Sequence, residues 1–268
     1  MHSPEPEAVN ARAWTTYGNH HVQRGTEVPE VDRISWGFWP TGPGVKVLGD
    51  LAGLRILDLC SGRHAAHLAA RGADVTAVDA SPSQHQRAVT RRPDTPGLRL
   101  VCADAAARPA RRRPVRPDLL RVLRAVPGPL PAAARPGQRL CTGRLFFSPL
   151  HTDSGGTGPS SEVAPRPEIL RLPGTTDDHP VDMWGLTEQL REDLLVQHGL
   201  TMEAVTAIDS DKPDNRVSYR RYAARRRRWD RPAGTAGSAR ARSPSGTETP
   251  PGAERSVTCR KAAAPTWV

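Results

Sequence analysis

The stretch that most constrains this chain is residues 56–81, ILDLCSGRHAAHLAARGADVTAVDAS. LRILDL at 54–59 is an apolar run of strand length, which predicts a buried strand. RHAAHLAARG at 63–72 places small apolar residues at helical spacing and ends in glycine, which predicts a helix. ADVTAVDA at 73–80 predicts a second strand. A strand, a short loop, a helix and a strand in this order form the first unit of a parallel sheet with helical crossovers.

The same alternation continues further along the chain. Ser81 is an expected N-cap, and the proline after it suits the first helical position, so a helix is predicted over 82–92. GLRLVCADA (97–105) and RLFFSPLH (144–151) read as the third and fifth strands. We therefore expect an α/β fold, with a Rossmann-like, doubly wound and mostly parallel sheet.

The last third of the chain predicts a different ending to this sheet. TEQLREDLLVQHG (187–199) is an amphipathic helix with Thr187 as its cap. LTMEAVTAI (200–208) and VSYRRYAAR (217–225) fit a final antiparallel strand pair. Residues 152–184, between the fifth strand and this helix, are predicted to be a long loop or lid.

Composition divides the chain into an ordered body and irregular parts. Residues 1–10 and 229–268 are predicted to be disordered, and 11–228 to form one domain. Within the domain, 107–144 carries seven prolines and an arginine cluster where a helix, a fourth strand and another helix should stand. We interpret it as an irregular, out-of-frame segment. The fourth strand position should be poorly filled, or filled by DLLRVLRAV (118–126) with its two arginines toward solvent.

The formal charge of +10 and the pI of about 10.4 raise the question of nucleic-acid binding. The excess positive charge lies in 108–124, 220–228 and the tail 229–268, while the remaining body is mildly acidic. No aromatic stacking platform is interleaved with these arginine runs. Solvated runs are therefore favoured over a nucleic-acid site, and a nucleic-acid binder is retained only as a third hypothesis.

The four cysteines, Cys60, Cys102, Cys141 and Cys259, are scattered without a C-x-x-C pair, so no zinc site is expected. They read as reduced thiols of a cytoplasmic protein. No apolar run approaches the roughly 18 residues of a membrane span, so no membrane partner is expected. The adjacent Asp177, Asp178 and His179 do not predict a metal site without distant ligands.

Acidic residues end three successive predicted strands, namely Asp58, Asp79 and Asp104. The loop after the first strand, Cys60-Ser61-Gly62, contains one glycine. A dinucleotide-binding loop would read G-x-G-x-x-G here. The order and spacing of ILDLCSG, VTAVDAS and LVCADA instead resemble class I S-adenosylmethionine-dependent methyltransferases, especially the small-molecule branch that includes quinone-biosynthesis enzymes. The resemblance covers residues 36–106 well and 145–225 more loosely.

This resemblance implies S-adenosylmethionine as cofactor and a small-molecule methyl acceptor as partner. Asp58 would bond the methionine amine or order the loop, whose N–H groups would face the methionine carboxylate. Asp79 would accept both ribose hydroxyls, and Asp104 the adenine amino group. The expected cofactor-binding residues are Asp58, Cys60, Ser61, Gly62, Asp79, Ala80, Ser81, Asp104 and Ala105.

The loop departs from the family pattern in a way that bears on activity. The interval from Asp58 to Asp79 is two residues shorter than in the family, and two glycines are missing. Cys60 and Ser61 carry a Cβ where glycine lets the backbone approach the ligand. We expect weakened cofactor binding and impaired activity. A non-enzymatic degraded paralogue and an NAD(P)-binding Rossmann protein stay open as alternatives.

Methyl transfer depends mainly on positioning, so the resemblance implies no obligatory catalytic residue. A hydroxyl acceptor would need a base, and the candidate is His151, which with Asp153 follows the fifth strand. Other residues could lie near the cofactor mouth, although packing or surface roles are favoured for them: Tyr17, His20, His21 and Trp36. Packing or surface roles are also expected for His64 and His67.

Overall fold

The computed structural model describes residues 6–26, 33–37, 41–59, 62–105, 143–153 and 155–226, together with the backbone of 119–124. Several predictions made above lie outside the described residues. They concern the expected disorder of 1–5 and 229–268, most of the irregular segment 107–144, and the loop residues Cys60 and Ser61.

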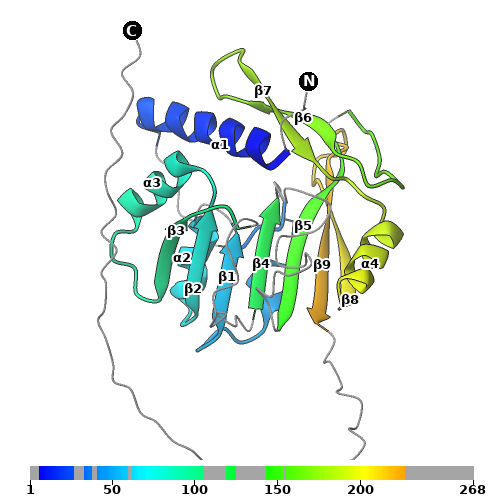
Figure 1. The fold of residues 1–268 in the computed structure, drawn as a ribbon, viewed down its shortest axis with the longest axis horizontal. Helices are drawn as coiled ribbons and strands as arrows, with labels where there is room; N and C mark the ends of the chain where they lie inside the picture. The colour runs from blue at the N-terminus through cyan, green and yellow to red at the C-terminus, as the bar shows by residue number, and fades with distance from the viewer. Residues whose placement is uncertain are drawn as a thin grey trace, which may run out of the picture. The chain divides into compact units, whose positions relative to one another are not determined.

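The secondary structure alternates as the sequence predicts (Figure 1). The helices are α1 (Pro6–Gln23), the 3₁₀ helix η1 (Gly44–Leu48), α2 (Arg63–Ala69), α3 (Pro82–Arg91) and α4 (Glu188–Gln197). The strands are β1 (Arg55–Leu59), β2 (Asp74–Asp79), β3 (Leu98–Cys102), β4 (Leu119–Arg124), β5 (Arg144–Thr152), β6 (Arg166–Arg171), β7 (Asp178–Met183), β8 (Leu200–Asp209) and β9 (Ser218–Arg226).

Seven strands form one sheet in the order β3-β2-β1-β4-β5-β9-β8. The first five are parallel, and β9 and β8 run antiparallel to their neighbours. The order turns back at β1, from which β2 and β3 extend to one side and β4 and β5 to the other. The predicted doubly wound, mostly parallel sheet with a final antiparallel pair is thus confirmed. Such a sheet places its ligand site outside the carboxyl ends of the strands, at this switch point.

Alternation along the strands produces two cores, one on each face of the sheet. Ile56 and Phe146 face a core that includes Trp36 and the apolar side of α2. Their neighbours Leu57 and Phe147 face a second core, which includes residues of α4. Helices cover both faces, as a buried parallel sheet requires.

Two helix starts follow the local signals in the sequence. Ser81 caps α3 by accepting the N–H of Gln84, with Pro82 in the first helical turn. Thr187 caps α4 by accepting the N–H of Leu190. Each hydroxyl satisfies an amide that the helix leaves without an internal partner.

Helix α1 shows that the predicted disorder of residues 1–10 is wrong for 6–10. The helix begins at Pro6, a residue that suits a first helical position, and Glu7 lies in its first turn. Asn10 is buried and exchanges two hydrogen bonds with the backbone of Asp182, donating to its carbonyl at 2.8 Å and accepting from its N–H at 2.7 Å. Because Asp182 lies 172 positions away, sequence inspection could not show this anchor.

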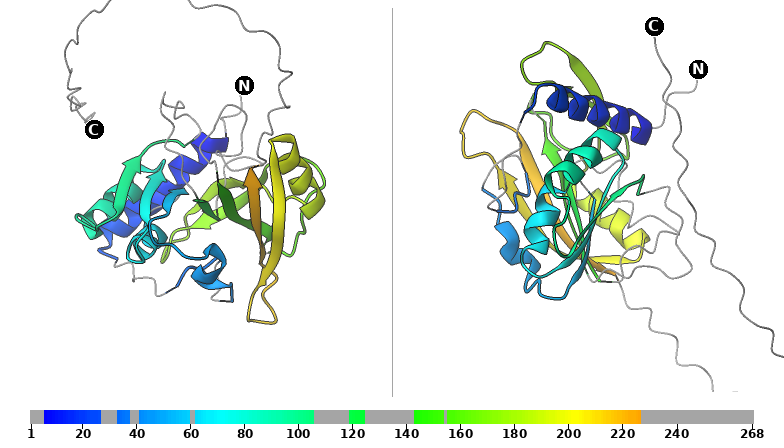
Figure 2. Two further views of the ribbon diagram at one scale, coloured as in Figure 1. Left: turned by 90° about the horizontal axis from the view of Figure 1, so that it is seen from below. Right: turned by 90° about the vertical axis from the view of Figure 1, so that its left-hand side faces the viewer.

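The segment 152–184, predicted as a long loop or lid, contains a β-hairpin. Strands β6 and β7 pair antiparallel in a separate two-stranded sheet. Figures 1 and 2 show this hairpin beside α1, which lies across the carboxyl ends of β1, β2 and β4. The contact extends along the helix, since Asn10 meets Asp182 and His20 Nε2 lies 2.9 Å from the carbonyl of Pro173. Alternating exposure along β6 marks it as a strand with one solvated side.

The fourth strand position is filled. Residues 119–124 pair in parallel with β1 on one side and with β5 on the other. Of the two predicted possibilities, a poorly filled position or a strand formed by DLLRVLRAV, the structure has the second. The orientation of its arginines lies outside the described structure. Among the described helices, none has the length and apolar character needed to cross a membrane.

Candidate functional site

The carboxyl ends of β1 and β2 bring two carboxylates together. Asp58 is fully buried one residue before the end of β1 and pairs in register with Ala77 of β2. Asp79, the last residue of β2, is two positions beyond Ala77, so both acids lie at the same edge of the sheet. Burial is the main cause that raises the pKa of Asp79, and the negative charge of Asp58 adds a smaller effect in the same direction, which agrees with this proximity.

The Asp79 carboxylate is partly buried, and only one of its two oxygens accepts a hydrogen bond within the described structure. Its Oδ1 accepts the N–H of Ser81 at 2.8 Å, and Oδ2 has no hydrogen-bond partner among the described residues. Burial raises the pKa of Asp79, against the opposing effects of the Ser81 N–H and the nearby His85. A half-satisfied carboxylate at a strand end is suited to accept hydroxyl protons from a ligand.

Gly62 supplies the turn between β1 and α2. It has a φ of 85°, a left-handed conformation, and is the N-cap residue of α2. A Cβ here would lie 3.1 Å from Leu100 Cδ2 and 3.4 Å from Ala88 Cβ. The left-handed backbone conformation therefore favours glycine at this position, and a Cβ would also press against Leu100. Its two predicted partners in the loop, Cys60 and Ser61, lie outside the described residues.

The next two predicted site residues have different surroundings. Ala80 is exposed directly after β2. Ser81 is 1% exposed, and its hydroxyl caps α3 while lying 3.1 Å from the Thr15 hydroxyl of α1. The side chain of Ser81 therefore joins α1 to α3, and its N–H orients Asp79.

Asp104 and Ala105 follow β3 at the same edge. Cys102, the last residue of β3, pairs with Asp79, so Asp104 lies two residues beyond the level of that carboxylate. Asp104 is exposed and Ala105 is half-buried. The three acids therefore follow one another along β1, β2 and β3, which are adjacent in the sheet.

A group of basic side chains near Gly62 was not singled out from the sequence. Arg63 is the first residue of α2, and its Nε is buried without a hydrogen-bond partner among the described residues. Arg87 and Arg91 lie one turn apart on α3, where Arg87 donates to Gln84 at 2.7 Å. Burial lowers the pKa of Arg87 and Arg91, and the charge of Arg63 lowers both further. The sequence did offer one indication of this basic group, because Arg63 directly follows Gly62, the single glycine of the loop.

Helix α1 contributes aromatic rings to the same region. The rings of Tyr17 and His21 lie 4.4 Å apart between centroids. His21 is buried, and neither ring nitrogen has a partner among the described residues. Burial lowers the pKa of His21, and the charges of Arg87, His20 and Arg24 lower it further. Of the residues considered for the cofactor mouth, Tyr17 and His21 thus lie near the α3 arginines.

The remaining aromatic and histidine candidates have packing roles. Trp36 is fully buried and donates its indole N–H to the carbonyl of Gly44 at 2.8 Å. His64 lies 3.5 Å from the Ser35 hydroxyl, and His67 is buried in α2. His20 contacts the hairpin, as described above.

On the opposite side of β4, His151 lies near the carboxyl end of β5. The ring is half-buried, and its Nδ1 is buried without a partner in the described part of the chain. Burial lowers the pKa of His151, helped by Arg220 and Arg191 and opposed by Glu188 and Asp209. A neutral imidazole at this edge can accept a proton.

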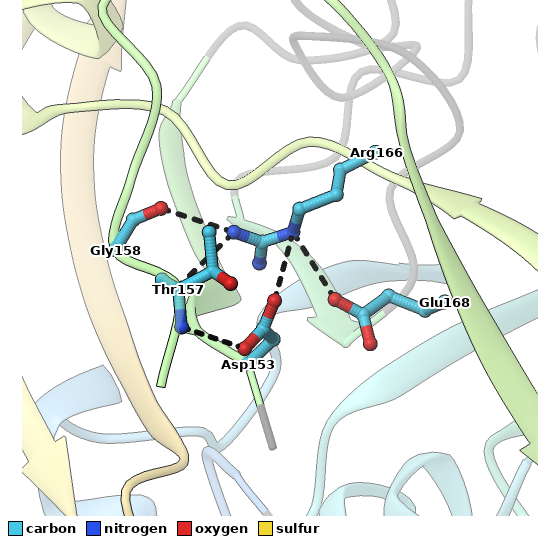
Figure 3. Close-up of polar contacts among 5 residues, drawn as sticks. All are labelled: Asp153, Thr157, Gly158, Arg166 and Glu168. Carbon is cyan, nitrogen blue, oxygen red and sulfur yellow. Dashed lines mark hydrogen bonds and ion pairs between the residues drawn. The ribbon is translucent and has the colours of Figure 1, made fainter. Parts of the chain in front are cut away.

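Asp153, predicted together with His151, is engaged elsewhere (Figure 3). Its carboxylate accepts the N–H of Thr157 at 2.8 Å and lies 3.6 Å from Arg166 Nε. Arg166 of β6 also meets Glu168 at 3.1 Å and donates to the carbonyl of Gly158 at 3.0 Å. Through these contacts, Arg166 of the β6–β7 hairpin binds the segment that follows β5. The contacts give Asp153 a structural role and lower its pKa despite partial burial.

The hairpin acids do not form a metal centre with their neighbours. Asp178 pairs with Arg171 at 3.2 Å across the hairpin. In the ranges that the structure describes, no group of three or more His, Cys, Asp or Glu side chains is arranged to hold a metal ion.

No protein-family model and no curated protein matches the sequence. Among solved structures, the fold is similar to 1,6-didemethyltoxoflavin-N1-methyltransferase from Burkholderia thailandensis, with bound 1,6-didemethyltoxoflavin and S-adenosylhomocysteine. The identity is 17%, the TM-score 0.51, and the match covers 84% of this chain and 92% of the other. A protein from Listeria monocytogenes assigned as an S-adenosylmethionine-dependent methyltransferase matches at 16% identity and a TM-score of 0.50, covering 68% and 95% of the two chains.

These similarities establish the fold. The chain has the Rossmann-like fold of class I S-adenosylmethionine-dependent methyltransferases, as the sequence motifs predict. The comparisons do not single out the quinone-biosynthesis branch.

Proposed function

We propose that this chain binds S-adenosylmethionine at the carboxyl edge of β1, β2 and β3 and transfers its methyl group to a small-molecule acceptor. The observation that carries the proposal is the series of acids Asp58, Asp79 and Asp104 at the ends of three adjacent strands, beside the left-handed turn at Gly62. The neighbouring methyltransferase folds support it.

The residues at this edge fit the cofactor group by group. Asp79 offers an unpaired carboxylate oxygen to the ribose hydroxyls, held in place by the Ser81 N–H. Gly62 supplies the left-handed turn that begins α2, whose first N–H groups would face the methionine carboxylate. Arg63 adds a positive charge next to this turn, which complements a carboxylate. When bound, the sulfonium supplies an electrophilic methyl group, and the chain's part is to orient it and exclude water.

The strand order argues against the alternative of an NAD(P)-binding protein. A dinucleotide-binding Rossmann sheet has six parallel strands in the order 3-2-1-4-5-6 and a G-x-G-x-x-G loop. Here the sixth sheet position is taken by the antiparallel β9, with β8 outside it. The loop after the first strand contains a single glycine, Gly62. The sheet therefore favours the methyltransferase proposal.

Calorimetric titration with S-adenosylhomocysteine tests the proposal directly. Replacing Asp79 by asparagine keeps an oxygen for the Ser81 N–H but removes the charge that strengthens two hydrogen bonds to the ribose. A charged acceptor strengthens each such bond by about 1–1.5 kcal/mol, so Asp79→Asn should weaken binding roughly 30- to 150-fold. Asp74→Asn, at the exposed start of the same strand, is the matched control and should bind as the wild type does.

Two outcomes would count against the proposal. Equal affinity of the wild type and Asp79→Asn would remove Asp79 from the site. A wild type that folds but binds no S-adenosylhomocysteine would favour a degraded, non-enzymatic paralogue. Binding without methyl transfer to any small-molecule acceptor would match the impaired activity that the shortened loop predicts.

A further inference from the structure

The end of β5 departs from regular pairing at one residue. Leu150 pairs with Tyr219 of β9 and Thr152 pairs with Ser218, so two steps on β5 face one on β9. His151 is the extra residue of this β-bulge. Bulges turn a side chain out of its regular direction and recur beside active sites. His151 is the one histidine in the described strands of the seven-stranded sheet, and the bulge changes the direction of its side chain, so we consider what this residue could do.

The strand register shows how far His151 lies from the proposed cofactor residues, and this distance leaves room for a methyl acceptor between them. Leu59, the last residue of β1, pairs with Val122 of β4, which pairs with Phe147 of β5. His151 is four residues further along β5, about 13 Å beyond the level at which β1 ends. It is also two strands, or about 10 Å, to the side. Such a residue lies beyond the level at which β1 ends and on the other side of β4 from the proposed cofactor residues, where a second molecule bound over β4 could contact it.

The chemical state of the ring suits proton transfer. Its buried Nδ1 has no hydrogen-bond partner in the described structure, so it can bond to a ligand or a water molecule. The groups that act on the ring are Arg220 of β9, Arg191 and Glu188 of α4, and Asp209 of β8. Arg220 is paired with Glu188 at 2.9 Å and lies 3.6 Å from Asp209, so these charges largely offset one another.

Burial therefore dominates and lowers the pKa of His151. The ordinary pKa of histidine is about 6.5, so the ring is neutral at neutral pH and can take up a proton. As the pH falls through the lowered value the ring becomes charged, and its capacity as a base is lost.

We propose that His151 is the general base of the reaction and that the acceptor therefore presents an ionisable O–H group, such as a phenol. The acceptor oxygen attacks the methyl carbon of the sulfonium, and the C–S bond breaks with its electron pair passing to sulfur. The O–H proton moves to an imidazole nitrogen of His151 and leaves to solvent afterwards. This inference rests on the proposed function, because it assumes the methyl donor.

The test uses the full chain and two phenols, 4-nitrophenol and catechol, as probes. In the complex with S-adenosylhomocysteine, 4-nitrophenol should shift the NMR resonance of the His151 ring, assigned from the spectrum of His151→Gln. The ring of His198, which caps the far end of α4, should not shift. Methyl transfer from labelled S-adenosylmethionine to catechol should fall at least about 100-fold in His151→Gln, the lower range for loss of a general base.

The pH profile separates a base from a structural residue. In the wild type, transfer should decline as the pH falls below the His151 pKa, and this decline should be absent in His151→Gln. Affinity for S-adenosylhomocysteine should be unchanged in His151→Gln, which also shows that this variant folds. His198→Gln should keep both the rate and the acid limb of the profile.

Other outcomes overturn the inference in distinguishable ways. A His151→Gln variant that keeps the rate and the acid limb removes His151 as the base. A wild type that binds S-adenosylhomocysteine but methylates only amine probes, or neither phenol, overturns the acceptor class and leaves the proposed function standing. If the wild type binds no S-adenosylhomocysteine, the proposed function fails and this inference falls with it.

Discussion

Asp79 shows how a ligand site can oppose stability at a single residue. Burial raises the pKa of its carboxyl above the ordinary value of about 3.9, so the folded chain holds this proton more tightly than the unfolded chain does. Stability without ligand therefore falls as the pH rises through the interval between these two pKa values. At neutral pH the buried negative charge of Asp79 lowers the free energy of unfolding. A cofactor that donates two hydroxyl hydrogen bonds to the carboxylate would offset this loss.

This reasoning predicts a pH dependence of ligand affinity. Calorimetry from pH 7 downward should show constant affinity for S-adenosylhomocysteine at first, then a decline that begins above the pH expected for an ordinary aspartate. Without ligand, Asp79→Asn should have a melting temperature at pH 7 equal to or above that of the wild type. A variant that loses both affinity and thermal stability would contradict this, since it would indicate that the Asp79 charge stabilises the unliganded fold.

At the scale of the element, α1 is held between two partners. One side contacts the β6–β7 hairpin through Asn10, and the other contacts α3, where the Ser83 hydroxyl donates to the carbonyl of Thr15 at 2.7 Å. Gly18 makes the second contact possible, because a Cβ there would overlap the side chain of Ser83. Helix α1 therefore covers the carboxyl edge as a fixed element, and the glycine sets its distance from α3.

Gly18→Ala tests this packing because two effects oppose each other. Alanine favours a helix over glycine by about 1 kcal/mol, so an exposed position would gain stability. Here we expect a net loss of about 1–3 kcal/mol from overpacking against α3, measured by denaturant unfolding. Asn19→Ala, at the exposed neighbouring position of α1, is the control and should raise stability by up to about 0.7 kcal/mol through helix propensity alone. A stabilised Gly18→Ala protein would show that α1 and α3 do not pack this closely.

The same elements show which parts of the fold a sequence can predict. Ser81-Pro82 and Thr187 are local signals, and both helices begin where these residues indicate. Helix α1 and the hairpin depend on each other through Asn10 and Asp182, a contact that no local pattern contains. Prediction therefore succeeded in the alternating strands and helices and failed for the hairpin and for residues 6–10 of α1, which contacts it.

For the site the division is similar. Asp58, Asp79 and Asp104 were predicted because a strand end is a local property, and parallel pairing brings strand ends to one edge. Arg63 and Arg87 come near each other because Gly62, before α2, lies close to Ala88 of α3, and this is a tertiary contact that no local pattern contains. The engagement of Asp153 by Arg166 likewise arises from the hairpin, so its separation from His151 could not be predicted.

At the scale of the whole molecule, the sheet is continuous only because β4 joins its two halves. Residues 119–124 bridge β1 and β5, and without them β3-β2-β1 would have no backbone pairing with β5-β9-β8. The proposed cofactor residues belong to the first half, and His151 belongs to the second. The relative position of the proposed donor and acceptor sites therefore depends on a strand that lies within the proline- and arginine-rich segment 107–144.

Hydrogen exchange across the full chain tests this bridge. Amides of a strand paired on both sides open only with the larger cooperative unit, whereas an edge strand opens more easily. Protection of 119–124 should therefore be within roughly tenfold of that of β1, a difference of about 1.4 kcal/mol, and should exceed that of the edge strand β3. If the amides of 119–124 exchange as fast as those of β3 or faster, the two halves are not joined through β4. In that case His151 would not be held at a fixed distance from the proposed cofactor edge, and methyl transfer that depends on it should be slow even where S-adenosylhomocysteine binds tightly.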